Sequence, residues 1–177
     1  MSDQVWTGET EAHERAFMSI GRLVYRWNLI ERAFSMNVLM LNQSILEERR
    51  PRLVEPIGQK IELWEKMFPM SSLTDMQSVS DEYVQLLTDA KNDRNNLLHA
   101  NWGLDPFETS FEEITLSFMS FKKNDVLIGD SRITIDTVDE YVRSLGALTQ
   151  YNLRFSIVLT GLGSSNLANG GRPRSPT

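Results

Sequence analysis

The segment from Arg94 to His99 reads R-N-x-x-x-H and holds residue types that could do chemistry. Arginine is always charged and donates several hydrogen bonds in one plane, so it binds anions such as phosphate. Histidine has an ordinary pKa of about 6.5 and can give or take a proton near neutral pH. The segment therefore carries an anion-binding group and an acid-base group close together in sequence.

Helix periodicity predicts that two charged residues face inward, among apolar side chains. The two stripes that contain them are Tyr83, Leu87, Ala90, Arg94 and Leu97, and Ile20, Val24, Trp27, Glu31 and Phe34. An inward arginine needs an anion, and the simplest partner for Arg94 is Glu31.

A purely structural interpretation follows, in which Glu31 and Arg94 form a buried ion pair between two core helices. It explains those two residues and leaves His99 without a reason. On an ideal helix, residues five apart differ in direction by about 140°. Arg94 and His99 are therefore expected to converge only if the helix ends between them or if the arginine reaches across.

Four helices are expected to position this segment, because apolar residues recur every three or four positions in four stretches. The first covers residues 9–43 and, at about 1.5 Å per residue, would be roughly 50 Å long, which hints at a dimer partner. Pro51 and Pro69 bound the second. Ser71 or Ser72 is expected to cap the third, and Thr137 and Glu140 have the spacing of a capping box for the fourth, which is expected to end at Gly161.

Between the third and fourth helices the pattern changes to alternation, with Ile114, Leu116 and Phe118 separated by less apolar residues. The prediction is a mainly α protein, a four-helix bundle with a small antiparallel β ribbon inserted between helices three and four. Residues 1–8 are expected to be a flexible N-terminus, 9–161 the helical domain, and 162–177 a disordered tail.

Composition narrows the function classes. The chain has 177 residues, a net charge of -6 and no cysteine. The charge argues against a surface that coats duplex nucleic acid, although a local positive cleft would remain possible. No metal site and no cofactor are expected, since there are only two histidines, no HExxH pattern and no P-loop. No membrane span or secretory signal is expected, and the predicted location is the cytoplasm.

The Arg94 to His99 segment at a helix end, followed by Trp102 and Gly103, resembles the HEPN superfamily (higher eukaryotes and prokaryotes nucleotide-binding domains). That family is characterised by an arginine, four to six residues and then a histidine, with a polar residue often following the arginine. The order of the helices and the segment WNLIER on the first helix are also similar. The resemblance covers most of residues 9–161, with about three motif positions that are specific.

The resemblance implies an all-helical homodimer that cleaves RNA without a metal ion, through attack of a ribose 2′-hydroxyl on the adjacent phosphate. It implies that Arg94 and His99 are catalytic, that Asn95 orients the phosphate or the imidazole, and that Glu31 holds the guanidinium in place. Trp102 is a possible substrate contact. The resemblance to this family also suggests that the protein is a toxin or defence component with an antitoxin partner protein.

Two alternatives remain open at this point. One is a catalytically inactive HEPN-like module that binds nucleic acid or a protein, and the other is a purely structural dimerisation domain. Fold does not decide between them.

Overall fold

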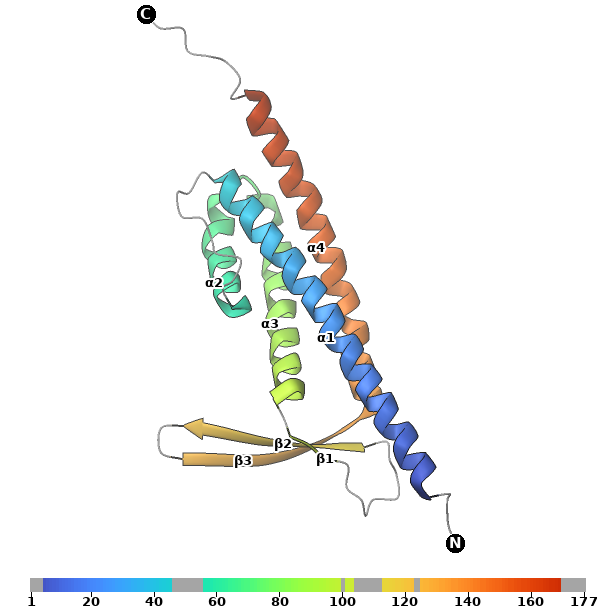
Figure 1. The fold of residues 1–177 in the computed structure, drawn as a ribbon. Coiled ribbons are helices and arrows are strands. Elements are labelled where there is room, and N and C mark those ends of the chain that lie inside the picture. The colour runs from blue at the N-terminus through green and yellow to red at the C-terminus, as the bar shows by residue number, and fades with distance from the viewer. Residues whose placement is uncertain (1–4, 46–55, 100, 104–112, 123–124, 170–177) are drawn as a thin grey trace, which may run out of the picture. The chain divides into compact units, whose positions relative to one another are not determined.

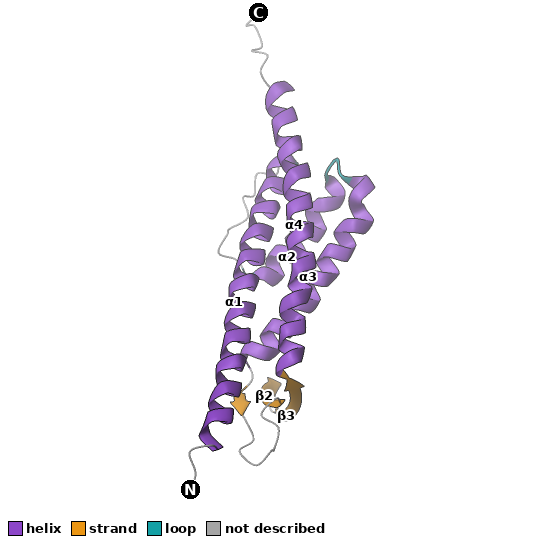
Figure 2. Cartoon of the chain, turned by 90° about the vertical axis from the view of Figure 1, so that its right-hand side faces the viewer, coloured by secondary structure: helices purple, strands orange, loops and turns teal. Residues whose placement is uncertain are grey.

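The computed structural model describes residues 5–45, 56–99, 101–103, 113–122 and 125–169, with side chains in 14–45, 56–98 and 134–162. Figure 1 shows the elements in chain order, and Figure 2 shows that most of these residues are helical. The elements are α1 (Val5–Ser44), α2 (Ile57–Met67), the 3-10 turns η1 (Phe68–Met70) and η2 (Thr74–Met76), α3 (Gln77–His99), β1 (Asn101–Gly103), β2 (Glu113–Lys122), β3 (Asp125–Thr134) and α4 (Ile135–Asn169). The prediction of a mainly α protein with four helices is confirmed.

The first and last helices of the chain are both longer than predicted. α1 begins at Val5 rather than at residue 9, and α4 continues to Asn169 rather than ending at Gly161. Once a helix exists, each added residue gains a hydrogen bond, and this can outweigh a glycine's cost of about 1 kcal/mol. The helices therefore include residues 5–8 and 162–169, which were expected to lie outside the helical domain, whereas 1–4 and 170–177 lie outside the described residues.

The serine expected to cap the third helix instead shapes the turn before it. The Ser71 hydroxyl donates to the Phe68 carbonyl oxygen at 2.7 Å and accepts from the Leu73 N–H at 3.2 Å. The turn η2 follows, and α3 begins only at Gln77. The predicted N-cap at Ser71 or Ser72 is thus wrong, because a 3-10 turn separates these serines from the α-helix.

The segment between α3 and α4 runs as three antiparallel strands in the order β1-β2-β3. Trp102 of β1 pairs with Leu116, and Ile114 of β2 pairs with Ile133. β1 begins two residues after the end of α3, and β3 leads directly into α4. The three paired strands therefore connect the end of α3 to the start of α4.

Thr134, the last residue of β3, caps α4. Its Oγ1 accepts a hydrogen bond from the Thr137 N–H at 3.1 Å and lies 2.9 Å from the Thr137 Oγ1. An N-cap oxygen bonded to the N–H three residues later satisfies a donor that the helix cannot. The predicted capping box at Thr137 and Glu140 is wrong, because the helix already begins where the strand ends.

The chain divides into two compact units, Met1–Asn28 with Asp89–Gly146 (unit 1) and Leu29–Thr88 with Ala147–Thr177 (unit 2). Unit 2 has an aromatic core: the Trp64 ring lies 5.1 Å from Phe155 and 5.6 Å from Phe34. The Trp64 Nε1–H donates to the Ser80 hydroxyl at 2.8 Å, which joins α2 to α3. Trp64 is buried, and so is Trp27, which confirms the predicted inward position of Trp27.

A buried polar layer crosses the same core. Asn37 of α1 donates to the Asn152 carbonyl oxygen at 3.1 Å and accepts from the Ser156 hydroxyl at 2.7 Å. The Tyr83 hydroxyl donates to Asn152 Oδ1, and burial raises the pKa of Tyr83 far above its usual range. These bonds hold α1, α3 and α4 in one register within unit 2.

In unit 1, polar contacts join α1 to the first turns of α4. Arg15 pairs with Asp136, the Ser19 hydroxyl donates to Asp139 at 2.6 Å, and the Arg26 guanidinium donates to the Val142 carbonyl oxygen at 3.1 Å. The apolar residues buried in this unit are Ala16, Leu23, Trp27, Leu97, Ile135, Val138, Val142 and Leu145. Leu97 anchors the end of α3 in this core.

Candidate functional site at the end of helix α3

The predicted segment forms the last turns of α3. The helix is continuous from Gln77 through His99, so Arg94, Asn95 and His99 all lie on it. All three belong to unit 1, as does Trp102 of β1. The side chains of His99 and Trp102 lie outside the described ones, so their roles stay predictions.

The helix does not end between the arginine and the histidine, because both residues are helical. On an ideal helix their directions differ by about 140°, and the axis rises by about 7.5 Å between them. The first possibility considered from the sequence, that the helix ends between Arg94 and His99, is therefore wrong. The remaining route within one chain is for the arginine to reach across.

Arg94 is half-buried and incompletely hydrogen-bonded. Its Nη1 donates to the Oδ1 of its neighbour Asn95 at 2.8 Å, while its Nε–H is buried and has no acceptor among the described residues of unit 1. Among the described side chains of its own unit (14–28, 89–98 and 134–146), Arg94 has no carboxylate partner. Buried donors without acceptors are rare and call for an explanation, such as an anion or water that binds there.

Glu31, predicted to pair with Arg94, has another cation beside it. Its carboxylate lies 3.7 Å from the Nζ of Lys60, whose side chain is only 6% exposed. Glu31 and Lys60 belong to unit 2 and Arg94 to unit 1, so the pairing of Glu31 with Arg94 stays a prediction. Sequence reasoning overlooked Lys60, although it precedes the buried Trp64 by one helical turn and shares its stripe.

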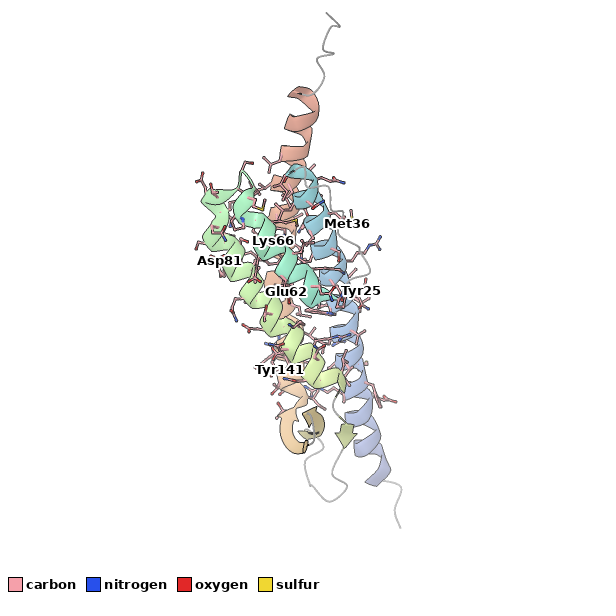
Figure 3. The ribbon with its side chains drawn as sticks, turned by 90° about the vertical axis from the view of Figure 1, so that its left-hand side faces the viewer. Tyr25, Met36, Glu62, Lys66, Asp81 and Tyr141 are labelled. Atoms are coloured by element: carbon pink, nitrogen blue, oxygen red, sulfur yellow. The ribbon has the colours of Figure 1, made fainter. Side chains whose placement is uncertain are left out.

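Two further groups beside the segment were not predicted. Burial raises the pKa of Asp93, and the nearby Asp89 carboxylate raises it further. Burial also raises the pKa of Tyr141 on α4, with smaller effects from Asp93 and Glu140; Figure 3 labels Tyr141. A half-buried carboxylate one residue before Arg94 weakens the local positive potential, which any anion bound there must overcome.

Comparisons of the chain with protein-family profiles, with curated proteins and with solved structures find no match. The resemblance to the HEPN superfamily thus rests on the residues of this chain alone. Within the residues that the structure describes, no group of three or more metal-ligating side chains could hold an ion. Over the same part of the chain, no helix is both long and apolar enough to cross a membrane.

Proposed function

We propose that the chain is a metal-independent endoribonuclease that acts as a homodimer, with Arg94, Asn95 and His99 in its active site. The observation that carries the proposal is the Arg94 guanidinium, half-buried in the last turns of α3, with one N–H group that has no acceptor among the described residues of its unit. A phosphate of RNA offers oxygens that satisfy such donors, often two at once. The proposal extends to a cytoplasmic toxin or defence component with an antitoxin partner, as the family resemblance implies.

The proposed reaction needs no group from outside the protein and the RNA. His99 takes the proton of a ribose 2′-hydroxyl, whose oxygen attacks the adjacent phosphorus. The bond from phosphorus to the 5′-oxygen breaks, and that oxygen receives a proton. The products are a 2′,3′-cyclic phosphate and a 5′-hydroxyl, and Arg94 stabilises the negative charge that develops on the phosphate in between.

Asn95 supports this role through its contact with Arg94. Its Oδ1 accepts from the guanidinium, which leaves its amide N–H groups to donate to a phosphate oxygen. As the family resemblance implies, Glu31 would restrain the guanidinium; its carboxylate has two oxygens and can contact Arg94 as well as Lys60.

The angle between Arg94 and His99 favours a site that two chains share. A single α3 directs the two residues about 140° apart, whereas a homodimer brings a second copy of each residue to one cleft. The Arg94 of one chain would then act with the His99 of the other, which gives two equivalent sites in the dimer.

The same angle, together with the neighbouring Asp93, supports a second candidate function. A module that binds nucleic acid without cleaving it needs Arg94 and no convergence with His99. It predicts that replacing Arg94 weakens RNA binding and that replacing His99 changes nothing.

The test is cleavage of a mixed single-stranded RNA and of a tRNA pool in EDTA by the wild type, Arg94→Ala and His99→Ala. We expect the wild type to cleave and each variant to lose at least about 100-fold in rate, as when one group that stabilises a transition state is removed. His13→Ala and Arg22→Ala are matched controls that should keep full activity. An inert wild type, or His99→Ala with unchanged activity, would contradict the proposal.

A further inference from the structure

Two helices of unit 2 expose large apolar side chains. On α1, Leu29 is 51% and Met36 48% exposed, and on α4, Leu153 is 62% and Ile157 64% exposed. We call these four residues the outer face. Met36 is labelled on α1 in Figure 3. Single exposed apolar residues are common in proteins, whereas a group of them marks a surface that binds something.

On α1, the apolar residues of the outer face adjoin the side that contacts α4. Asn37 points toward α4, because its side-chain amide donates to the carbonyl oxygen and the Oδ1 of Asn152. Around an ideal helix, Leu29 lies about 80° and Met36 about 100° from Asn37, in the direction away from the buried core. The exposed Arg32 lies about 40° beyond Met36. The two apolar residues therefore lie between the contact with α4 and an arginine.

On α4, the arrangement is the same. Asn152 points toward α1 through its bond with Asn37. Around an ideal helix, Leu153 lies about 100° and Ile157 about 140° from Asn152, again in the direction away from the buried core. The exposed Arg154 lies about 60° beyond Ile157. The apolar residues of both helices thus form one band along the outside of the α1–α4 contact, with an arginine at each edge.

Acidic residues avoid this band, although the chain has 24 Asp and Glu residues against 18 Lys and Arg. Over residues 29–45 of α1 and 147–162 of α4, the one acidic residue is Glu31. Glu31 lies on the other side of α1, beside Lys60 of α2. The exposed acidic residues that the structure describes in unit 2 lie instead on α2, η2 and α3; they are Glu62, Glu65, Asp75, Asp81 and Glu82. Figure 3 labels Glu62 and Asp81 among them.

The size of the outer face suits a helical segment better than a whole folded domain. Residues 29–44 of α1 and 147–162 of α4 each extend about 24 Å, and each helix is about 10 Å wide. The face therefore covers about 480 Å², and a complex would bury about 1,000 Å² in total, which is typical of weak or transient complexes. A partner helix of about 16 residues has the same length as the face.

We propose that the outer face binds an acidic amphipathic helix of a partner protein. Such a helix places apolar residues at every third or fourth position against the band. Carboxylates along its edges then meet Arg32 on one side and Arg154 on the other. Nucleic acid has no use for the apolar band. A membrane surface is recognised by several basic residues, whereas this face has two, in a chain with a net charge of -6.

The probe is a labelled synthetic peptide of about 18 residues, with Leu along one helical face, Glu at its edges and Ala elsewhere. A second peptide carries Lys in place of each Glu. Binding is measured by fluorescence anisotropy at low salt. We expect the wild type to bind the Glu peptide at least about 10-fold more tightly than the Lys peptide, because its two arginines attract the first and repel the second. The double variant Arg32→Glu, Arg154→Glu should reverse this preference.

Ile157→Glu and Met70→Glu form a matched pair. Ile157→Glu should weaken binding of the Glu peptide at least about 10-fold, because it replaces an apolar contact by a charge. Met70 of η1 is also an exposed apolar residue of unit 2, at 58%, and lies outside the outer face, so Met70→Glu should bind as the wild type does. No binding of the Glu peptide, equal binding of both peptides, or an unchanged affinity of Ile157→Glu would overturn the proposal.

The same two variants test other occupants of the face. Binding of the wild type to phosphatidylglycerol vesicles that Ile157→Glu alone removes would assign the face to a membrane surface. A dimer in sedimentation velocity that Ile157→Glu alone dissociates would assign it to a second copy of the chain. Either result would overturn the proposal, and we expect neither.

This inference goes beyond the proposed function and does not rest on it, since its tests use no RNA. A protein that binds the Glu peptide without cleaving RNA would refute the ribonuclease proposal alone. A protein that cleaves RNA without binding the peptide would refute the partner proposal alone.

Discussion

At the scale of single residues, Arg94 is the feature that a purely structural role explains least. A core arginine held by an ion pair would have its donors met by a carboxylate. Here the Nη1 is bonded to Asn95, and the Nε–H has no acceptor among the part of unit 1 that the structure describes. An unsatisfied buried donor costs about 1–3 kcal/mol. Binding of a phosphate would recover that free energy, which is why we place the substrate there.

Asp93 provides a prediction about pH. Its pKa is raised in the folded state above the ordinary value of 3.8, so folding disfavours its charged form. Ionised Asp93 therefore lowers stability above the folded-state pKa, and this cost disappears as the pH falls below 3.8. We expect Asp93→Asn to raise the melting temperature at pH 7 by about 2 °C, a typical effect of a partly exposed residue.

The measurement is thermal unfolding followed by circular dichroism at pH 7 and toward pH 3.5, where the gain should vanish. Asp81→Asn, at an exposed carboxylate of the same helix, is the control for the loss of one negative charge. A lower melting temperature for Asp93→Asn at pH 7 would contradict the burial of this carboxylate.

At the scale of elements, the strand-to-helix junction at Thr134 marks the start of α4. Thr134→Ala removes the acceptor of the Thr137 N–H and should cost about 1 kcal/mol of unfolding free energy. Thr137→Ala removes only a hydroxyl contact and should cost less. Urea unfolding of both variants measures the difference, and a larger cost for Thr137→Ala would favour the capping box that the sequence suggested.

The sequence was sufficient to predict four helices and the inward position of Trp27, because apolar periodicity reflects burial directly. Helix ends were harder to predict. The start of α3 depends on Ser71 bonding within a preceding turn, and that of α4 on Thr134 at the end of a strand. Such caps compete locally by small free energies that a single sequence does not reveal.

The candidate site was predictable only in part. The sequence located Arg94 at the end of a helix, but not the contact of Glu31 with Lys60 or the raised pKa values of Asp93 and Tyr141. Each of these depends on a neighbour distant in sequence or on partial burial. Residue spacing along a single helix carries neither kind of information.

At the scale of the whole molecule, the proposal of a shared cleft makes a prediction that no single variant tests. If Arg94 of one chain works with His99 of the other, then Arg94→Ala and His99→Ala are each inactive, and a mixed dimer contains one intact site. Equal mixing should restore cleavage to about a quarter of the wild-type rate, since half of the dimers are mixed and each has one of two sites.

That mixture should be assayed after the chains have exchanged, with each variant alone at the same total concentration as the control. If mixing restores nothing although wild-type chains cleave, Arg94 and His99 of the same chain act together. The arginine would then have to reach across the helix, despite the angle of about 140°.

The measurement that tests the central claim most directly is mass spectrometry of the ends of RNA fragments made in EDTA. The substrates are one oligonucleotide and a second copy that lacks the 2′-hydroxyl at the cleaved ribose. The account predicts 2′,3′-cyclic phosphate and 5′-hydroxyl ends from the wild type on the first substrate, no cut at the modified ribose, and no fragments from His99→Ala. Fragments with other ends, or cleavage that persists without the 2′-hydroxyl or without His99, would contradict it.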